Sequence, residues 1–174
     1  MSALRFLTKT SAGAQRLLAA ITSSAGAGDA NKIVATGADG KLDGTLLPTG
    51  VGADTTTKPA TENLAAGDLV NFHDNGGTPS VRKADASNGR RADGFVLTSV
   101  TSGANATVYP PGSQVTELTG LTIGTYYLSG STAGAVSATP PDPATATGQI
   151  MQEVGRADST TSFFFNPQEP TEIG

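Results

Sequence analysis

Residues 68–84, DLVNFHDNGGTPSVRKA, carry the pattern that decides the fold: two short strand-like runs on either side of a turn. In the first run, Val70 and Phe72 alternate with polar side chains, as in a strand with one buried face. Asparagine, glycine and proline are typical of turns, and residues 74–79 (DNGGTP) combine all three. A second run, residues 80–84, follows. The stretch therefore predicts an antiparallel β-hairpin.

The same alternation of short runs and turn signals continues towards the C-terminus. Strand-like runs are expected at residues 95–100, 106–109, 115–118, 126–129, 135–138, 149–156 and 162–165. About nine short strands at this spacing are typical of an antiparallel barrel or sandwich. We therefore expect an all-β, barrel-like or sandwich-like body over residues 63–170, followed by a tail of residues 171–174. The register near Gln152 is open, because this polar residue shares a predicted face with apolar neighbours.

Towards the N-terminus, residues 1–62 lack this regular alternation and predict a partly helical, extended arm. Leu17, Leu18 and Ile21 recur at helical spacing after Ser11, a residue type that suits an N-cap. A short helix is therefore expected within residues 1–24. Such a helix is marginal alone, because nucleation is costly, and it needs a surface to pack on.

The second half of this arm, residues 25–62, is rich in glycine and threonine and predicts an extended segment that lies on a surface. Leu42, Leu46 and Leu47 are its expected apolar anchors. Ordering the segment costs roughly 1–2 kcal/mol of backbone entropy per residue, which these few leucines cannot offset by folding on themselves. The surface is expected to belong to a neighbouring subunit or to a different protein.

The composition argues against several classes of partner. The chain has 174 residues, a formal net charge of −4 and no cysteine. Nucleic-acid binding needs clustered Lys and Arg with a matching field, so no nucleic-acid partner is expected. Without cysteine there is no disulfide and no thiolate metal site. No apolar run approaches the roughly 18 residues of a membrane span, so no membrane partner is expected.

No constellation of residues indicates catalysis, a cofactor or a metal. His73 is the single histidine, and the Gly-x-Ser-x-Gly pattern of a nucleophile elbow is missing. Asp39, Asp43 and Asp54 lie among glycines, but the alternating acidic positions and closing Glu of a calcium loop are missing as well. We expect a protein that is not an enzyme and has no cofactor.

Two groups of residues expected at the surface fit either a structural role or a binding role. Arg82, Lys83, Arg90 and Arg91 form a basic cluster, which is either a solvated hairpin edge or a docking patch for an acidic surface. Phe164 points to the opposite face of a strand from Phe163 and Phe165. It is either covered by a loop or placed in a subunit contact.

The ordered succession of segments resembles the head decoration (capsid cement) proteins of tailed bacteriophages. Residues 30–54, ANKIVATGADGKLDGTLLPTGVGAD, are similar to a segment of phage virion proteins in which a Gly-Lys-Leu-Asp-x-Thr-Leu-Leu-Pro pattern precedes the structural body. Residues 64–112, which begin LAAGDLVNFHDNGG, resemble the decoration proteins themselves, and residues 118–141 and 148–170 fit the same family.

This resemblance implies a β-barrel-like homotrimer that binds the major capsid protein across capsomer junctions and stabilises an icosahedral capsid. It implies no enzymatic activity and no cofactor. The protein would be made in the host cytoplasm and would lie on the outer surface of the phage head. The side chains expected in capsid or subunit contacts are Leu17, Leu18, Ile21, Leu42, Leu46, Leu47 and Phe164.

Two other roles fit the same sequence. One is the base or shaft of a phage tail fibre or head fibre, since such proteins also carry the Gly-Lys-Leu-Asp segment, and copy number separates the two roles. The other is a carbohydrate-binding β-sandwich. That class uses exposed aromatic platforms, whereas this chain has no Trp and three Tyr.

Overall fold

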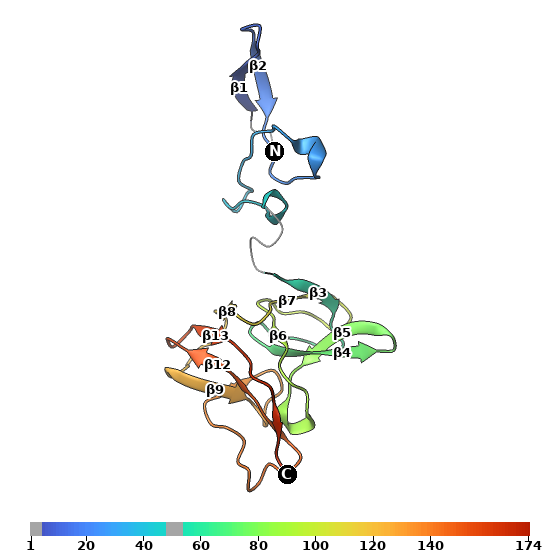
Figure 1. Cartoon of the computed structure of the whole chain (residues 1–174), viewed down its shortest axis with the longest axis vertical. Helices are drawn as coiled ribbons and strands as arrows, with labels where there is room; N and C mark the ends of the chain where they lie inside the picture. The colour runs from blue at the N-terminus through green and yellow to red at the C-terminus, as the bar shows by residue number, and fades with distance from the viewer. Residues whose placement is uncertain (1–4, 48–53) are drawn as a thin grey trace. The chain divides into compact units, whose positions relative to one another are not determined.

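The computed structural model describes residues 5–47 and 54–174 (Figure 1). The chain divides into two compact units, residues 1–52 and 53–174, which we call the N-terminal unit and the body. The elements, in chain order, are β1 (Arg5–Lys9), β2 (Gln15–Ala19), η1 (Ala27–Asp29), η2 (Gly44–Leu46), β3 (Thr56–Pro59), β4 (Leu69–Asn75), β5 (Thr78–Lys83), η3 (Ala86–Asn88), β6 (Gly94–Phe95), β7 (Asn105–Val108), β8 (Gln114–Val115), β9 (Gly124–Leu128), β10 (Val136–Ser137), β11 (Ile150–Met151), β12 (Glu153–Ala157), β13 (Phe163–Phe165) and β14 (Thr171–Glu172). The strands pair antiparallel, and the helical segments are 3-10 turns of three residues. The predicted all-β fold class is confirmed.

The helix expected within residues 1–24 is wrong for the residues described. β1 and β2 form an antiparallel hairpin instead. Its turn is closed by the amide of Thr10, which donates to the carbonyl of Ala14 at 2.8 Å, and Ser11 lies in this turn. Three apolar residues at short spacing fit a helix and a hairpin alike. Pairing with β1 satisfies the backbone of β2 without the cost of nucleating an isolated helix.

The rest of the N-terminal unit is held by hydrogen bonds rather than by a core. The amide of Ile21 donates to the carbonyl of Ile33, and the amide of Ala35 donates back to Ile21, both at 2.9 Å. Asp43 caps η2 by accepting from the Thr45 amide at 2.9 Å. The hydroxyl and the amide of Thr45 together lower the pKa of Asp43. The polar turns in residues 20–47 thus have local partners, whereas the apolar side chains do not gain a buried environment.

Five strands of the body close into a ring. β3 pairs with β7, and β4 pairs with both β5 and β6. Ala60, next to β3, bridges Val81 of β5, and Phe95 of β6 bridges Tyr109, next to β7. The order β3-β5-β4-β6-β7 therefore returns to β3 as a small barrel. Its interior holds the buried side chains of Ala60, Leu64, Val70, Val81, Val96, Ala106 and Val108.

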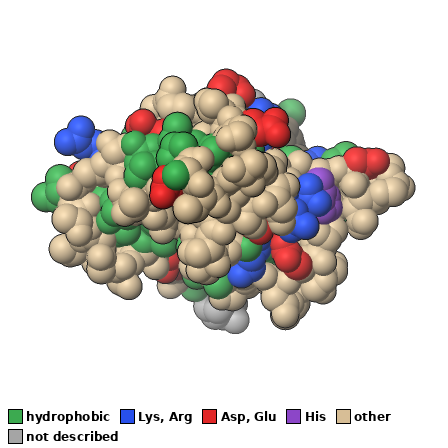
Figure 2. Space-filling model, turned by 90° about the horizontal axis from the view of Figure 1, so that it is seen from below, with side chains coloured by type: hydrophobic (Ala, Val, Ile, Leu, Met, Phe, Trp, Pro, Cys, Tyr) green, Lys and Arg blue, Asp and Glu red, His purple; other side chains and the backbone are tan. Residues whose placement is uncertain are grey.

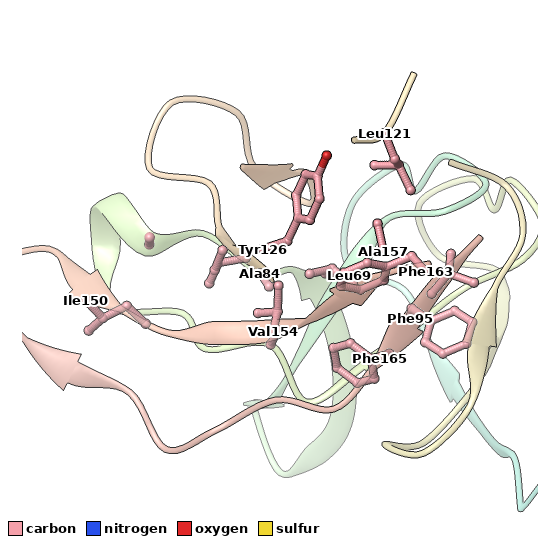
Figure 3. Close-up of a cluster of buried hydrophobic side chains, with 14 residues drawn as sticks. Leu69, Ala84, Phe95, Leu121, Tyr126, Ile150, Val154, Ala157, Phe163 and Phe165 are labelled. Carbon is pink, nitrogen blue, oxygen red and sulfur yellow. The ribbon is translucent and has the colours of Figure 1, made fainter. Parts of the chain in front are cut away.

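A five-stranded sheet, in the order β10-β9-β12-β13-β8, supplies a second layer of the body. A larger apolar cluster joins this sheet to the barrel wall (Figure 3). Leu69 of β4 belongs to this cluster while Val70 belongs to the barrel interior, because successive strand residues point to opposite faces. Phe95 from the barrel meets Phe165 from the sheet edge-on, with ring centroids 5.6 Å apart. The body is thus a barrel with a sandwich-like second core.

The structure shows how the polar Gln152 is accommodated between apolar strand residues. The side chain is 2% exposed and accepts from the Ala92 amide at 2.8 Å, while its nitrogen donates to the Gln168 carbonyl at 3.0 Å. Gln152 separates β11 from β12, and the pairing of β12 with β9 shifts between Glu153 and Gly155. Gln152 therefore interrupts the strand, and its buried side-chain amide forms hydrogen bonds with the backbone of Ala92 and Gln168.

The body extends further at both ends than residues 63–170. β3, within the stretch expected to be arm, pairs with β7 and forms part of the barrel. The expected tail, residues 171–174, is also built in, because β14 pairs with β11 and Ile173 is buried. The glycine- and threonine-rich sequence around β3 has no apolar alternation, so its place in the barrel depends on backbone pairing.

Candidate interaction surfaces

The N-terminal unit has an unusual distribution of apolar side chains. None of the residues 5–47 is buried. Its exposed large hydrophobic side chains are Phe6, Leu7, Leu17, Val34, Leu42 and Leu47. Burying one such side chain contributes about 1.5–3 kcal/mol, and a two-stranded hairpin alone is marginal in water. An exposed apolar surface of this kind is typical of sites that contact a protein, a membrane or a ligand, so the N-terminal unit is a candidate interaction surface.

Leu17 and Leu18 lie next to each other on β2 and face opposite sides of the hairpin. Leu17 pairs across the strands with Leu7, and Leu18 pairs with Phe6. Phe6 and Leu7 were missing from the sequence-based set of contacts. Their signal was the mirror arrangement of RFLTK and QRLLA around a Ser-Ala-Gly turn, which is typical of a hairpin.

The other leucine anchors occupy the loop part of the N-terminal unit. Ile21 is half-buried at the bridge to Val34. Leu42 and Leu47 are exposed, and Leu46 is half-buried in η2. Hydrogen-bonded turns hold the backbone of these residues while their side chains stay accessible, so they are available as anchors. Their contact with a partner stays a prediction.

Phe164 lies on the outer face of the five-stranded sheet. It pairs with Arg156 of β12 on one side and with Gln114 of β8 on the other, and its side chain is 47% exposed. Phe163 and Phe165 on the opposite face are fully buried in the sandwich-like core. Of the two sequence-based readings, burial of Phe164 under a loop is wrong. A subunit contact stays a prediction.

Three residues of the basic cluster have polar partners within the body. Lys83 forms an ion pair with Asp68 at 3.0 Å, and Arg91 pairs with Asp93 at 2.7 Å. Arg82 donates from Nε to the amide oxygen of Asn71 at 3.0 Å. Such surface pairs add little stability but leave less charge free for a partner.

Arg82 and Arg90 instead act on His73. Figure 2 shows the histidine in purple beside blue basic side chains on one side of the molecule. Nε2 of His73 lies 3.0 Å from the Thr61 hydroxyl, whereas Nδ1 is buried and has no hydrogen-bond partner among the described residues. Burial, and then the charges of Arg82 and Arg90, lower the pKa of His73. The docking role of the basic cluster stays a prediction.

The lowered pKa of His73 makes body stability depend on pH. The folded state binds the proton less readily than the unfolded chain, whose histidine titrates near about 6.5. Neutral His73 therefore contributes fully to the free energy of unfolding above that pH, and this contribution is lost as the pH falls below it. We expect the thermal midpoint of the wild-type chain to fall more between pH 7.5 and pH 5.5 than that of His73→Gln, as measured by circular dichroism. Parallel pH profiles for the two proteins would contradict this linkage.

Three hollows in the described part of the body differ in their lining from a small-molecule site. One of about 190 Å³ lies between Arg91 and Pro170, and one of about 330 Å³ is lined by serines, threonines and prolines around Asp142. A third, of about 410 Å³, lies beside Thr61 and Ser80. Ligand pockets are lined mainly by apolar and aromatic side chains, and none of these three contains an aromatic ring.

Residues 5–47 and 54–174 contain no group of three or more His, Cys, Asp or Glu side chains placed to hold a metal ion. In the same ranges, no helix has the length and apolar character that crossing a membrane requires.

No protein-family model matches the chain, and no curated protein matches it. Among solved structures, the chain is similar to the N base of the head fibre protein gp8.5 of bacteriophage phi29. The identity is 18%, the match covers 64% of this chain and 92% of that chain, and the TM-score is 0.41.

Proposed function

We propose that this chain is a non-catalytic structural protein of a tailed-phage virion, which decorates and stabilises the icosahedral head. The observation that carries the proposal is the contrast between its two units. The body has two fully buried cores of its own, whereas the described part of the N-terminal unit has exposed leucines and no buried residue. A folded body joined to an unsatisfied apolar segment is the organisation of a protein that attaches to a larger surface.

The segments that resemble decoration proteins support the choice of a phage head. Residues 30–54 fall largely on the exposed N-terminal unit, and residues 64–112 cover most of the barrel. In the proposal, the partners are the major capsid protein and two further copies of the chain, on the outer surface of the head. A homotrimer multiplies three weak attachments through effective concentration. Binding across capsomer junctions then stabilises the assembled shell by mass action.

Copy number in purified particles tests this function. Because icosahedral symmetry repeats each binding point, a decoration protein should be present in copies on the order of hundreds per particle. The measurement is quantitative mass spectrometry of phage particles against the major capsid protein, with cryo-electron microscopy to place the density. Copies in the tens, located at a tail or at isolated spikes, would assign the chain to a fibre base. Absence of the chain from particles would refute a virion role.

A further inference from the structure

The β1–β2 hairpin has an apolar pair on each of its two faces. One face presents Leu7 and Leu17, which are 64% and 59% exposed. The other presents Phe6, which is 42% exposed, paired with Leu18. A hairpin that lies on a surface needs apolar side chains on one face and polar side chains on the other. Neither face of this hairpin is free of large apolar side chains, so contact on one side leaves an apolar pair in water.

The charges of the hairpin are all of one sign. On the face of Leu7 and Leu17, the neighbouring cross-strand positions carry Arg5 and Lys9. On the opposite face, Arg16 pairs with Thr8, beside Phe6. The sequence contains no Asp or Glu before Asp29. Each face therefore combines an apolar pair with basic side chains, which is complementary to an acidic surface.

This charge pattern argues against the two other ways of covering the hairpin. Stacking the hairpins of two copies would place arginine and lysine against arginine and lysine, with no carboxylate in the hairpin to compensate. An anionic bilayer would attract the charges, but a hairpin lying in a membrane interface buries one face and leaves the other exposed. A protein that supplies two layers covers both pairs.

We infer that residues 5–19 insert as a wedge between two layers of an acidic protein surface on the particle, with the apolar pairs on both faces covered. The inference rests on the proposed function and adds to it the mode of attachment and the chemistry of the partner. The open backbone edges of β1 and β2 can also add to strands of that partner. Insertion of this kind occurs on binding, since the free N-terminal unit buries none of its described residues.

The absence of cysteine from the chain allows each face to carry a unique label. Thr8→Cys reports on the face of Phe6, Gln15→Cys reports on the face of Leu7, and Asn75→Cys at the exposed end of β4 is the matched control. Maleimide labelling is compared between the free full-length chain and particles that carry it. We expect labelling at both hairpin positions to slow by about tenfold or more on particles, with no change at Asn75→Cys.

The other outcomes each overturn the wedge. Protection of a single face would show a hairpin lying on a surface, and sedimentation with vesicles of phosphatidylglycerol would assign that surface to lipid. Protection of both faces in the free chain, increasing with concentration, would assign them to a second copy. Equal labelling of the free chain and of the chain on particles would show that the hairpin is not part of the contact. If the chain is missing from particles, the proposed function itself is refuted. The labelling patterns refute only the wedge, so the two failures can be told apart.

The charge of the partner is tested by a pair of double variants. Arg5→Gln with Lys9→Gln should weaken attachment to particles by about tenfold and reduce its dependence on salt. Lys41→Gln with Lys58→Gln changes the net charge equally outside the hairpin and should leave both properties unchanged. An equal loss in the two double variants would indicate a general effect of net charge and contradict a specific acidic site.

Discussion

Replacing Gly155 by alanine is expected to lower the free energy of unfolding by about 3 kcal/mol or more. A Cβ atom at this position would lie 2.1 Å from the carbonyl oxygen of Phe164 and 3.0 Å from the ring of Phe163. The neighbouring oxygen is backbone of the paired strand β13, so it cannot move without opening the ladder. Gly155 also has φ +144°, a conformation that other residues rarely adopt.

A matched substitution separates these two causes. Gly124 in β9 has a similar φ of +152°, but an added Cβ would meet no atom within 4 Å. Gly124→Ala therefore carries the backbone strain alone and should cost about 1 kcal/mol. Urea denaturation of both variants and the wild type gives the difference directly. Equal stabilities for the two variants would show that the strands separate to accept the methyl group, and the collision argument would be wrong.

Deleting residues 1–52 is expected to weaken attachment to particles by about 100-fold or more while leaving the body folded. The deletion removes the exposed leucines of the hairpin and of the loops, each of which contributes about 1.5–3 kcal/mol when buried by a partner. It leaves β3 and both apolar cores in place. Attachment is measured by co-sedimentation with undecorated particles, and folding is measured by the thermal midpoint.

A longer deletion provides the control. Removing residues 1–62 also removes β3 and the buried Ala60, and it opens the barrel between β7 and β5. This protein is expected to lose its cooperative unfolding transition. If it keeps the midpoint of the shorter deletion, the barrel does not need β3. If the shorter deletion binds particles as the full chain does, the N-terminal unit is not the attachment segment.

Local pattern predicted the strands whose faces differ in polarity. The runs at residues 106–109 and 162–165 correspond to β7 and β13, because alternation along these segments reflects burial on one side. The run at residues 149–156 is split in the structure by Gln152 and a shifted register. The closure of the barrel could not be predicted, since the bridges from Ala60 to Val81 and from Phe95 to Tyr109 join residues that no local pattern relates.

The candidate interaction surfaces were also predictable only in part from the sequence. Leu17, Leu42 and Leu47 were predicted as contact residues; the structure leaves them exposed, and their contact with a partner stays a prediction. The helix was wrong because three apolar positions do not define a period, and Phe6 and Leu7 were missed with it. The sequence groups Arg82, Lys83, Arg90 and Arg91 as one basic cluster, but it does not show that Lys83 pairs with Asp68 and Arg91 with Asp93. Partners from distant segments decide which charges remain free.

The closed barrel affects how readily the body aggregates at high local concentration. A sheet with a long open edge offers unpaired amides and carbonyls to any similar chain, and this is how β-proteins fuse into aggregates. In the ring β3-β5-β4-β6-β7 every strand has a neighbour on both sides. The second sheet ends in β10 and β8, which have two residues each and are too short to template another strand. Bodies of this design can be crowded side by side on a shell, or accumulate before assembly, without polymerising through their sheets.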